Sequence, residues 1–103
     1  MSVLLEFSMF PTDKGESKSK YVSRSIEIIE KSGLPYKMGP MGTVIEGQWD
    51  EVMAVVKQCF EVMSTDCDRV YTAIKADYRA SGENRLKTKI ESVEAKLGHK
   101  VQS

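Results

Sequence analysis

The sequence has few of the residues from which enzyme and metal sites are usually built. Its 103 residues include one histidine, His99, which follows Gly98 close to the C-terminus. A Ser-His-Asp or Cys-His arrangement needs its histidine in a cleft, and a histidine metal site needs a second nitrogen ligand. Neither of the phosphate-binding patterns GxxxxGK[ST] and GxGxxG occurs. These absences predict a protein that is not an enzyme and that binds no metal.

Cysteine and long apolar runs are also scarce. Cys59 and Cys67 lie eight positions apart, a spacing that matches neither a metal signature nor a disulfide framework, so we expect two reduced thiols. No apolar run approaches the roughly 18–20 residues of a membrane span. The N-terminal apolar stretch contains Glu6 and has no basic residue before it, unlike a secretory signal. We therefore expect a cytoplasmic protein with no membrane partner.

Net charge is lacking as well, because 15 Lys and Arg balance 15 Asp and Glu. This balance argues against a nucleic-acid partner. The hydrophobic fraction of 41% is typical of a soluble globular protein, and the length predicts one domain, residues 1–103. A domain of this size buries only about 60–65% of its unfolded surface, so self-association would add stability.

Four segments show strand patterns: residues 3–10, 36–38, 43–47 and 69–80. Alternation in the first of them predicts a core face made of Val3, Leu5, Phe7 and Met9. The same reasoning predicts that the fourth strand faces the core with Val70, Thr72, Ile74, Ala76 and Tyr78. Residues 39–42 (GPMG) predict a tight reversal between the second and third strands.

Three segments show helical periodicity. The first helix has Ser17 or Ser19 as its predicted N-cap and ends at Gly33, and its apolar face comprises Val22, Ile26 and Ile29. The second begins near Trp49, and its apolar stripe comprises Trp49, Val52, Met53, Val56, Cys59, Phe60 and Met63. The third ends at Gly98 and carries a stripe made of Leu86, Ile90, Val93 and Leu97.

This order of elements predicts an α+β fold, a ferredoxin-like βαββαβ sandwich with an extra C-terminal helix. The first two helices would cover one face of the sheet. The open face would carry a mixed set of side chains: Leu4, Glu6, Ser8, Phe10, Tyr71, Ala73, Lys75, Asp77 and Arg79. Such a face is too apolar to stay fully hydrated and too polar for a dry core. It therefore predicts a ligand or a second protomer on this face.

Residues 40–47 (PMGTVIEG) resemble the signature of a small family of thiamine-binding proteins with a ferredoxin-like fold. Further matching pieces occur in order along the chain: Pro11, 19–22 (SKYV), 32–36 (SGLPY), 69–70 (RV), 74–79 (IKADYR) and 89–93 (KIESV). Together they cover nearly the whole chain. The loop at 12–18 is more charged than the Gly/Thr/Ser-rich loop expected in this family.

The resemblance implies non-enzymatic binding of thiamine or its hydroxymethylpyrimidine moiety, in thiamine salvage or buffering. It also implies a homodimer or homotetramer, and no cofactor other than thiamine as the ligand. An aminopyrimidine needs hydrogen-bonding groups and an apolar wall, and a thiazolium favours carboxylates and aromatic faces. The residues that supply this chemistry on adjacent predicted elements are Ser8, Thr43, Glu46, Trp49 and Asp77. Of these, Glu46 and Asp77 are expected to approach one another across the open face, where the ligand would bind.

Each candidate also has a structural interpretation. Glu46 and Asp77 can form ion pairs, Thr43 can satisfy the backbone of the bend, and Trp49 can anchor the core or an interface.

Other functions fit the same order of elements. A regulatory module of the ACT type, which senses another small metabolite, remains an alternative. An RNA-binding RRM domain is disfavoured because the third predicted strand, TVIEG, has no aromatic residue. An enzyme of the acylphosphatase type is disfavoured because the loop after the first strand has no arginine.

Overall fold

Burial alternates along the central strand β1 (Ser2–Pro11), as the spacing of its apolar residues dictates. Val3, Leu5, Phe7 and Met9 are each at most 5% exposed, so the predicted core face of this strand is confirmed. The computed structural model describes residues 1–16 and 18–103. The predicted N-cap at Ser17 lies outside the described residues.

The described residues form a four-stranded antiparallel sheet in the order β2-β3-β1-β4. The other strands are β2 (Tyr36–Met38), β3 (Thr43–Gly47) and β4 (Val70–Arg79). In the register of the sheet, Leu5 lies opposite Ile45 on one side and Ala76 on the other. The strand predictions are therefore confirmed, with ends shifted by one residue at β1 and β4.

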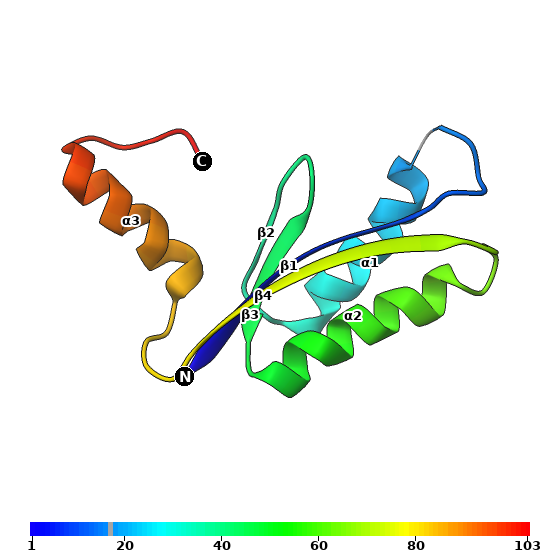
Figure 1. The fold of residues 1–103 in the computed structure, drawn as a ribbon, viewed down its shortest axis with the longest axis horizontal. Helices are drawn as coiled ribbons and strands as arrows, with labels where there is room; N and C mark the ends of the chain where they lie inside the picture. The colour runs from blue at the N-terminus through cyan, green and yellow to red at the C-terminus, as the bar shows by residue number, and fades with distance from the viewer. Residues whose placement is uncertain (17) are drawn as a thin grey trace.

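Two helices, α1 (Ser19–Ser32) and α2 (Trp49–Met63), pack side by side on one face of this sheet (Figure 1). The third helix, α3 (Arg85–Leu97), extends away from the end of the sheet where β1 begins (Figure 1). Gly33 and Gly98 end α1 and α3 in the left-handed conformation that glycine adopts without strain. This arrangement confirms the α+β, ferredoxin-like fold with an extra C-terminal helix.

The buried stripe of α1 differs from the predicted one. Tyr21, Ser25 and Ile29 are buried, whereas Val22 and Ile26 are only half-buried. Val22 therefore does not join the core as predicted, whereas Ile26 packs against the core, and Ser19 is the first helical residue rather than the N-cap. The two stripes are neighbours on the helix, and α1 is rotated so that the more polar one packs on the sheet.

The helix-side face of β4 is also less buried than its pattern predicts. Ile74 and Tyr78 are 45% and 55% exposed and Ala76 is also exposed, so these residues do not join the core as predicted. They do point to the same side of the sheet as the β1 core face. However, β4 is the edge strand, and the two helices pack mainly on β1, β3 and each other. Trp49 and Phe60 of the predicted α2 stripe are also about half exposed.

The long helices do not have the character of membrane spans. Within residues 1–16 and 18–103, no helix is both long enough and apolar enough to cross a bilayer.

We predict that truncation of the central core residue destabilises the protein far more than truncation of an exposed leucine. Leu5 is 0% exposed, so Leu5→Ala should lower the free energy of unfolding by about 2–5 kcal/mol. Leu97 is 53% exposed, and Leu97→Ala should change it by about 0.5 kcal/mol or less. Urea denaturation followed by circular dichroism measures both values, and equal losses in the two variants would contradict the described core.

Candidate functional site

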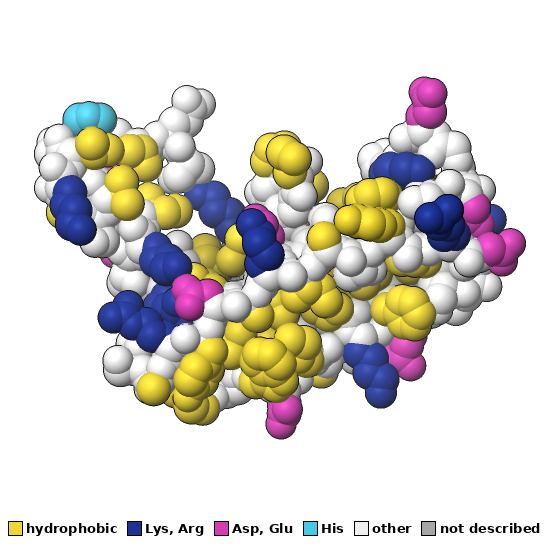
Figure 2. Space-filling model, in the orientation of Figure 1, with side chains coloured by type: hydrophobic (Ala, Val, Ile, Leu, Met, Phe, Trp, Pro, Cys, Tyr) yellow, Lys and Arg dark blue, Asp and Glu magenta, His cyan; other side chains and the backbone are white. Residues whose placement is uncertain are grey.

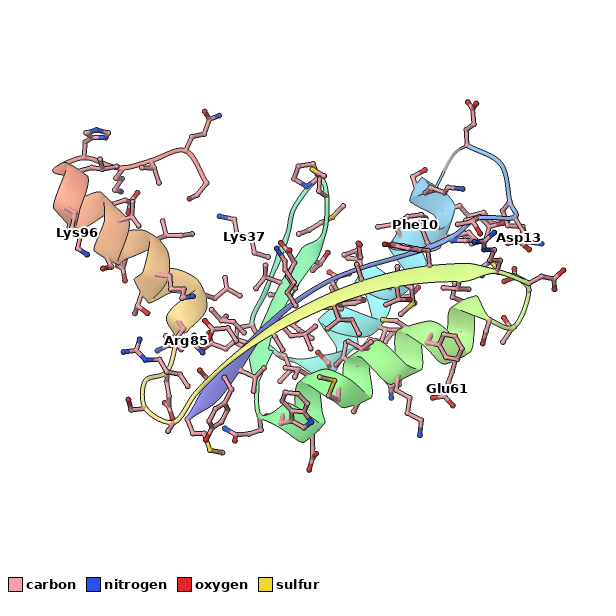
Figure 3. All side chains as sticks on the ribbon, viewed as in Figure 1. Phe10, Asp13, Lys37, Glu61, Arg85 and Lys96 are labelled. Carbon is pink, nitrogen blue, oxygen red and sulfur yellow. The ribbon has the colours of Figure 1, made fainter. Side chains whose placement is uncertain are left out.

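A groove of about 970 Å³ lies between α1 and the hairpin formed by β2 and β3. Figure 2 shows the hairpin rising from the surface beside α1. Figure 3 shows Phe10, a lining residue, on the α1 side of the hairpin and Lys37 on the opposite side, towards α3. The size of the groove is within the range of small-molecule sites, and its lining is mostly apolar with a few polar groups.

The hairpin wall of the groove is made by a tight turn. The Gly39 N–H donates a hydrogen bond of 2.9 Å to the Gly42 carbonyl. A Cβ added to Gly39 would lie 2.9 Å from that same oxygen, so this turn requires glycine. The turn leaves Met38 and Met41 56% and 91% exposed at the rim of the groove. Flexible methionine side chains can adapt their shape to a ligand.

The α1 wall combines apolar side chains with unsatisfied and charged groups. Val22 and Ile26 line the groove, and Ile26 also packs against the core. The Ser25 hydroxyl is buried and has no hydrogen-bond partner among the described residues. Glu27 and Glu30 contribute carboxylates further along the helix. The groove therefore contains an apolar wall, an unused hydroxyl and negative charge.

Two of the predicted ligand residues line this groove. Thr43 begins β3 and is 6% exposed, on the core side of the sheet opposite Phe7. Ser8 is half-buried and belongs to the open face by alternation, and it also lines the groove. The structure thus brings Ser8 and Thr43 to one cavity.

Glu46 lies elsewhere, at the junction between the sheet and α3. Its two carboxylate oxygens accept hydrogen bonds from the backbone N–H groups of Arg85, at 2.9 Å, and Leu86, at 3.0 Å. These are the first residues of α3, where the helix dipole favours negative charge. Burial by itself raises the pKa of Glu46, but these hydrogen bonds outweigh it and hold the pKa below its usual value.

Asp77 lies at the same junction. Its carboxylate accepts a hydrogen bond of 2.5 Å from the Arg85 guanidinium and one of 2.9 Å from Lys89. The hydrogen bond from Lys89, together with the charge of Arg85, holds the pKa of Asp77 below its usual value. Asp77 and Glu46 both lie opposite Leu4, on the two strands that flank β1. Arg85 connects them, because its backbone N–H donates to Glu46 and its guanidinium donates to Asp77.

Trp49, the remaining predicted ligand residue, begins α2. It is 52% exposed, and it lines neither the groove nor the α3 junction. The preceding residue, Gln48, forms a capping box with Glu51, which fixes the start of the helix. The position of Trp49 is therefore set by the helix start rather than by contact with the other candidates.

The sequence did not predict several residues of the groove and of the junction between the sheet and α3. Val22 and Ile26 had the apolar spacing of a core stripe, and this spacing does not distinguish a core from the wall of a groove. Arg85 is 3% exposed and holds Asp77, although long charged side chains are usually exposed. Its only signal in the sequence is a position shortly after the strand that carries Asp77.

Metal-ligating groups do not gather in the described part of the chain. Within it, no cluster of three or more His, Cys, Asp or Glu residues could hold a metal ion. His99 is exposed after α3, with its Nδ1 atom 3.0 Å from the Lys100 carbonyl oxygen.

One known protein family matches most of the chain. The family model described as thiamine-binding protein matches residues 5–94. The chain belongs to the thiamine-binding protein family. This membership confirms the resemblance seen in residues 40–47 and the matching pieces along the chain.

Relatives in this family come from archaea, bacteria and a fungus. UPF0045 protein MJ1052 of Methanocaldococcus jannaschii is 37% identical over 91 residues, which cover 88% of this chain and 91% of the relative. UPF0045 protein Mb1933 of Mycobacterium bovis is 40% identical over 98 residues, which cover 94% of this chain and 96% of the relative.

Solved structures agree with the fold. The crystal structure of the hypothetical protein MJ1052 superposes with a TM-score of 0.83, covering 89% of this chain and 95% of that chain, at 37% identity. TM0486 of Thermotoga maritima, described as a proposed thiamine biosynthesis/salvage protein, superposes with a TM-score of 0.79 at 25% identity. That comparison covers 90% of this chain and 99% of the Thermotoga chain.

We predict that the Glu46 carboxylate holds α3 to the sheet in a pH-dependent manner. Because the folded pKa of Glu46 is lowered, its contribution is complete above the unfolded value of about 4.3 and is lost as pH falls through the folded pKa. Glu46→Gln should weaken the attachment of α3 by about 1.5–3 kcal/mol at neutral pH. Hydrogen exchange of the Arg85 and Leu86 amides measures this loss.

The matched control is Glu91→Gln, the same change at an exposed position of α3. It should leave the exchange of both amides unchanged. Equal protection in Glu46→Gln and wild type would show that the carboxylate does not hold the helix.

Proposed function

We propose that the protein binds thiamine or its hydroxymethylpyrimidine moiety without converting it, and that the ligand occupies the groove between α1 and the β2–β3 hairpin. The observation that carries this proposal is the coincidence of the groove with the PMGTVIEG segment. Residues 40–43 of this segment line the groove, in a chain whose family is described as thiamine-binding.

The chemistry of the groove suits the two rings of thiamine. An aminopyrimidine has ring-nitrogen acceptors and an amine donor, and the hydroxyls of Ser8 and Thr43 can both donate and accept. The thiazolium carries a positive charge, which the carboxylates of Glu27 and Glu30 stabilise.

The residues that line the groove support binding of a ligand rather than its chemical conversion. The described lining of the groove contains hydroxyls, two carboxylates and Lys18, but neither histidine nor cysteine. A hydroxyl nucleophile needs an adjacent base to be activated. We therefore propose a role in thiamine salvage or buffering and not in catalysis.

The proposal includes self-association and a cytoplasmic location. Exposed apolar side chains on α2 and β4 support a homodimer or homotetramer. The cytoplasmic location stays a prediction; free, buried Cys59 and Cys67 are consistent with it.

The ligand role that the sequence predicts for Glu46, Trp49 and Asp77 is untested, and their contacts argue for a different place for the ligand. The carboxylate oxygens of Glu46 are engaged by two backbone N–H groups, and Asp77 is held by two cationic side chains. Since a ligand would have to displace these partners, we place the ligand in the groove instead.

Titration calorimetry with thiamine and with the isolated hydroxymethylpyrimidine tests the proposal. Thr43→Val keeps the shape of the side chain but removes its hydroxyl, and should weaken both ligands about fivefold to tenfold. Glu30→Gln removes a charge that only the thiazolium requires, so it should weaken thiamine and leave the pyrimidine unaffected. Glu91→Gln on α3 is the matched control for the charge and should bind like wild type.

The same titration distinguishes the groove from the open face. Glu46→Gln and Asp77→Asn should bind thiamine within about twofold of wild type, since neither residue lines the groove. If these two variants lose affinity while Thr43→Val and Glu30→Gln keep it, the ligand binds at the open face. If neither ligand gives a saturable heat of binding when it is titrated into the wild-type protein, thiamine binding would be rejected.

A further inference from the structure

Strand β1 has a short unpaired edge beside the groove. The pairing of β1 with β3 ends at the Phe7–Thr43 pair, whereas its pairing with β4 continues to Pro11. If the first register continued by two residues, Met41 would lie opposite Met9. Met41 lies instead in the turn between β2 and β3 and is 91% exposed. Within residues 1–16 and 18–103, the end of β1 therefore has a strand on one side only, and the groove lies towards its other side.

The alternation of hydrogen bonds along β1 determines which backbone groups face the groove. In an antiparallel pair, successive residues direct their N–H and C=O groups to opposite sides of the strand. The Thr12 N–H donates to the Arg69 carbonyl at 2.9 Å, which continues the register of β1 with β4. The even-numbered residues of β1 therefore bond with β4. The N–H and C=O of Met9 point the other way, towards the groove.

The hairpin gives the same assignment. The Glu46 N–H donates to the Pro35 carbonyl at 3.0 Å, so the even-numbered residues of β3 bond towards β2. The odd-numbered residues of β3 then bond with β1, and the last of these pairs joins Thr43 to Phe7. Met9 is the next odd-numbered residue of β1. The described part of the chain gives it no backbone hydrogen bond on this side.

The two backbone groups of Met9 complement one kind of ligand. Met9 lines the groove and is only 5% exposed, so its N–H and C=O are largely shielded from bulk water and need a partner within the groove. Together they present a hydrogen-bond donor beside an acceptor. Their complement is an acceptor beside a donor. A 4-aminopyrimidine has this pattern, because its ring nitrogen N3 lies beside the 4-amino group.

We propose that the Met9 backbone recognises the pyrimidine of the ligand: the N–H donates to N3, and the C=O accepts from the 4-amino group. This inference rests on the proposed function and adds to it the group that selects an aminopyrimidine. The hydroxyls of Ser8 and Thr43 do not select in this way, because a hydroxyl rotates to donate or to accept. The backbone groups are fixed by the sheet, so a ligand with the reversed pattern places donor against donor and acceptor against acceptor.

Titration calorimetry with two analogues of thiamine tests this selection. Oxythiamine has a 4-oxo group beside an N–H at N3, which reverses donor and acceptor. Pyrithiamine keeps the aminopyrimidine and replaces the thiazolium by a pyridinium. Pyrithiamine should bind within about threefold of thiamine, whereas oxythiamine should bind at least about tenfold more weakly, because a site built to hydrogen-bond a group rejects an analogue without it.

Three variants separate the backbone from the side chains around it. Ser8→Ala and Thr43→Val remove the two hydroxyls, and Met9→Leu changes the side chain while it keeps the backbone groups. The ratio of the thiamine and oxythiamine affinities should stay at about tenfold or more in each variant. Equal affinity for the two ligands in the wild type, or loss of the ratio in any of these variants, would overturn the inference.

A crystal structure of the complex with thiamine tests the position of the ring. N3 should lie about 2.7–3.2 Å from the Met9 backbone nitrogen, and the 4-amino nitrogen at a similar distance from the Met9 carbonyl oxygen. Thiamine in the groove with water on both Met9 groups would overturn this inference and leave the proposed function standing. Thiamine bound outside the groove, or no saturable heat with the wild type, would reject the proposed function and this inference with it.

Discussion

The pairing of β1 with β3 on one side and β4 on the other is the interaction on which the rest of the structure depends. Because β1 is central, its alternation sets two faces for the whole sheet. The face with Leu5 and Phe7 receives the helices and becomes the core. The face with Leu4 receives Glu46 and Asp77 from the two flanking strands, where they hold the start of α3.

Two helices are too few to cover all of this sheet, and they leave two parts of it uncovered: the groove beside α1 and the edge strand β4. At one side, α1 turns Tyr21 and Ser25 towards the core and leaves Val22 and Ile26 to face the hairpin, which creates the groove. At the other side, β4 lies beyond α2 and keeps its apolar side chains exposed. The groove is large enough to hold a small ligand, whereas β4 forms an edge of the sheet.

Much of this fold could be predicted from the sequence because its signals are local. Alternation in β1, the glycines that end α1 and α3, and the reversal at residues 39–42 each depend on a few neighbouring residues. The site was harder to predict because it depends on distant ones. Apolar spacing in α1 cannot reveal which of two adjacent stripes faces the sheet. The hydrogen bonds from the start of α3 to Glu46 join residues about 40 positions apart, and nothing near Glu46 in the sequence indicates these bonds.

The central claim is that a thiamine-type ligand occupies the groove between α1 and the β2–β3 hairpin. The most direct measurement is a titration of isotope-labelled protein with thiamine, followed through its backbone amide NMR signals. The account predicts that the signals that shift most belong to Val22, Ile26, Gly42 and Thr43, and that Arg85 and Leu86 stay within the noise. Shifts confined to Glu46, Asp77 and the start of α3, with the groove signals unmoved, would contradict it.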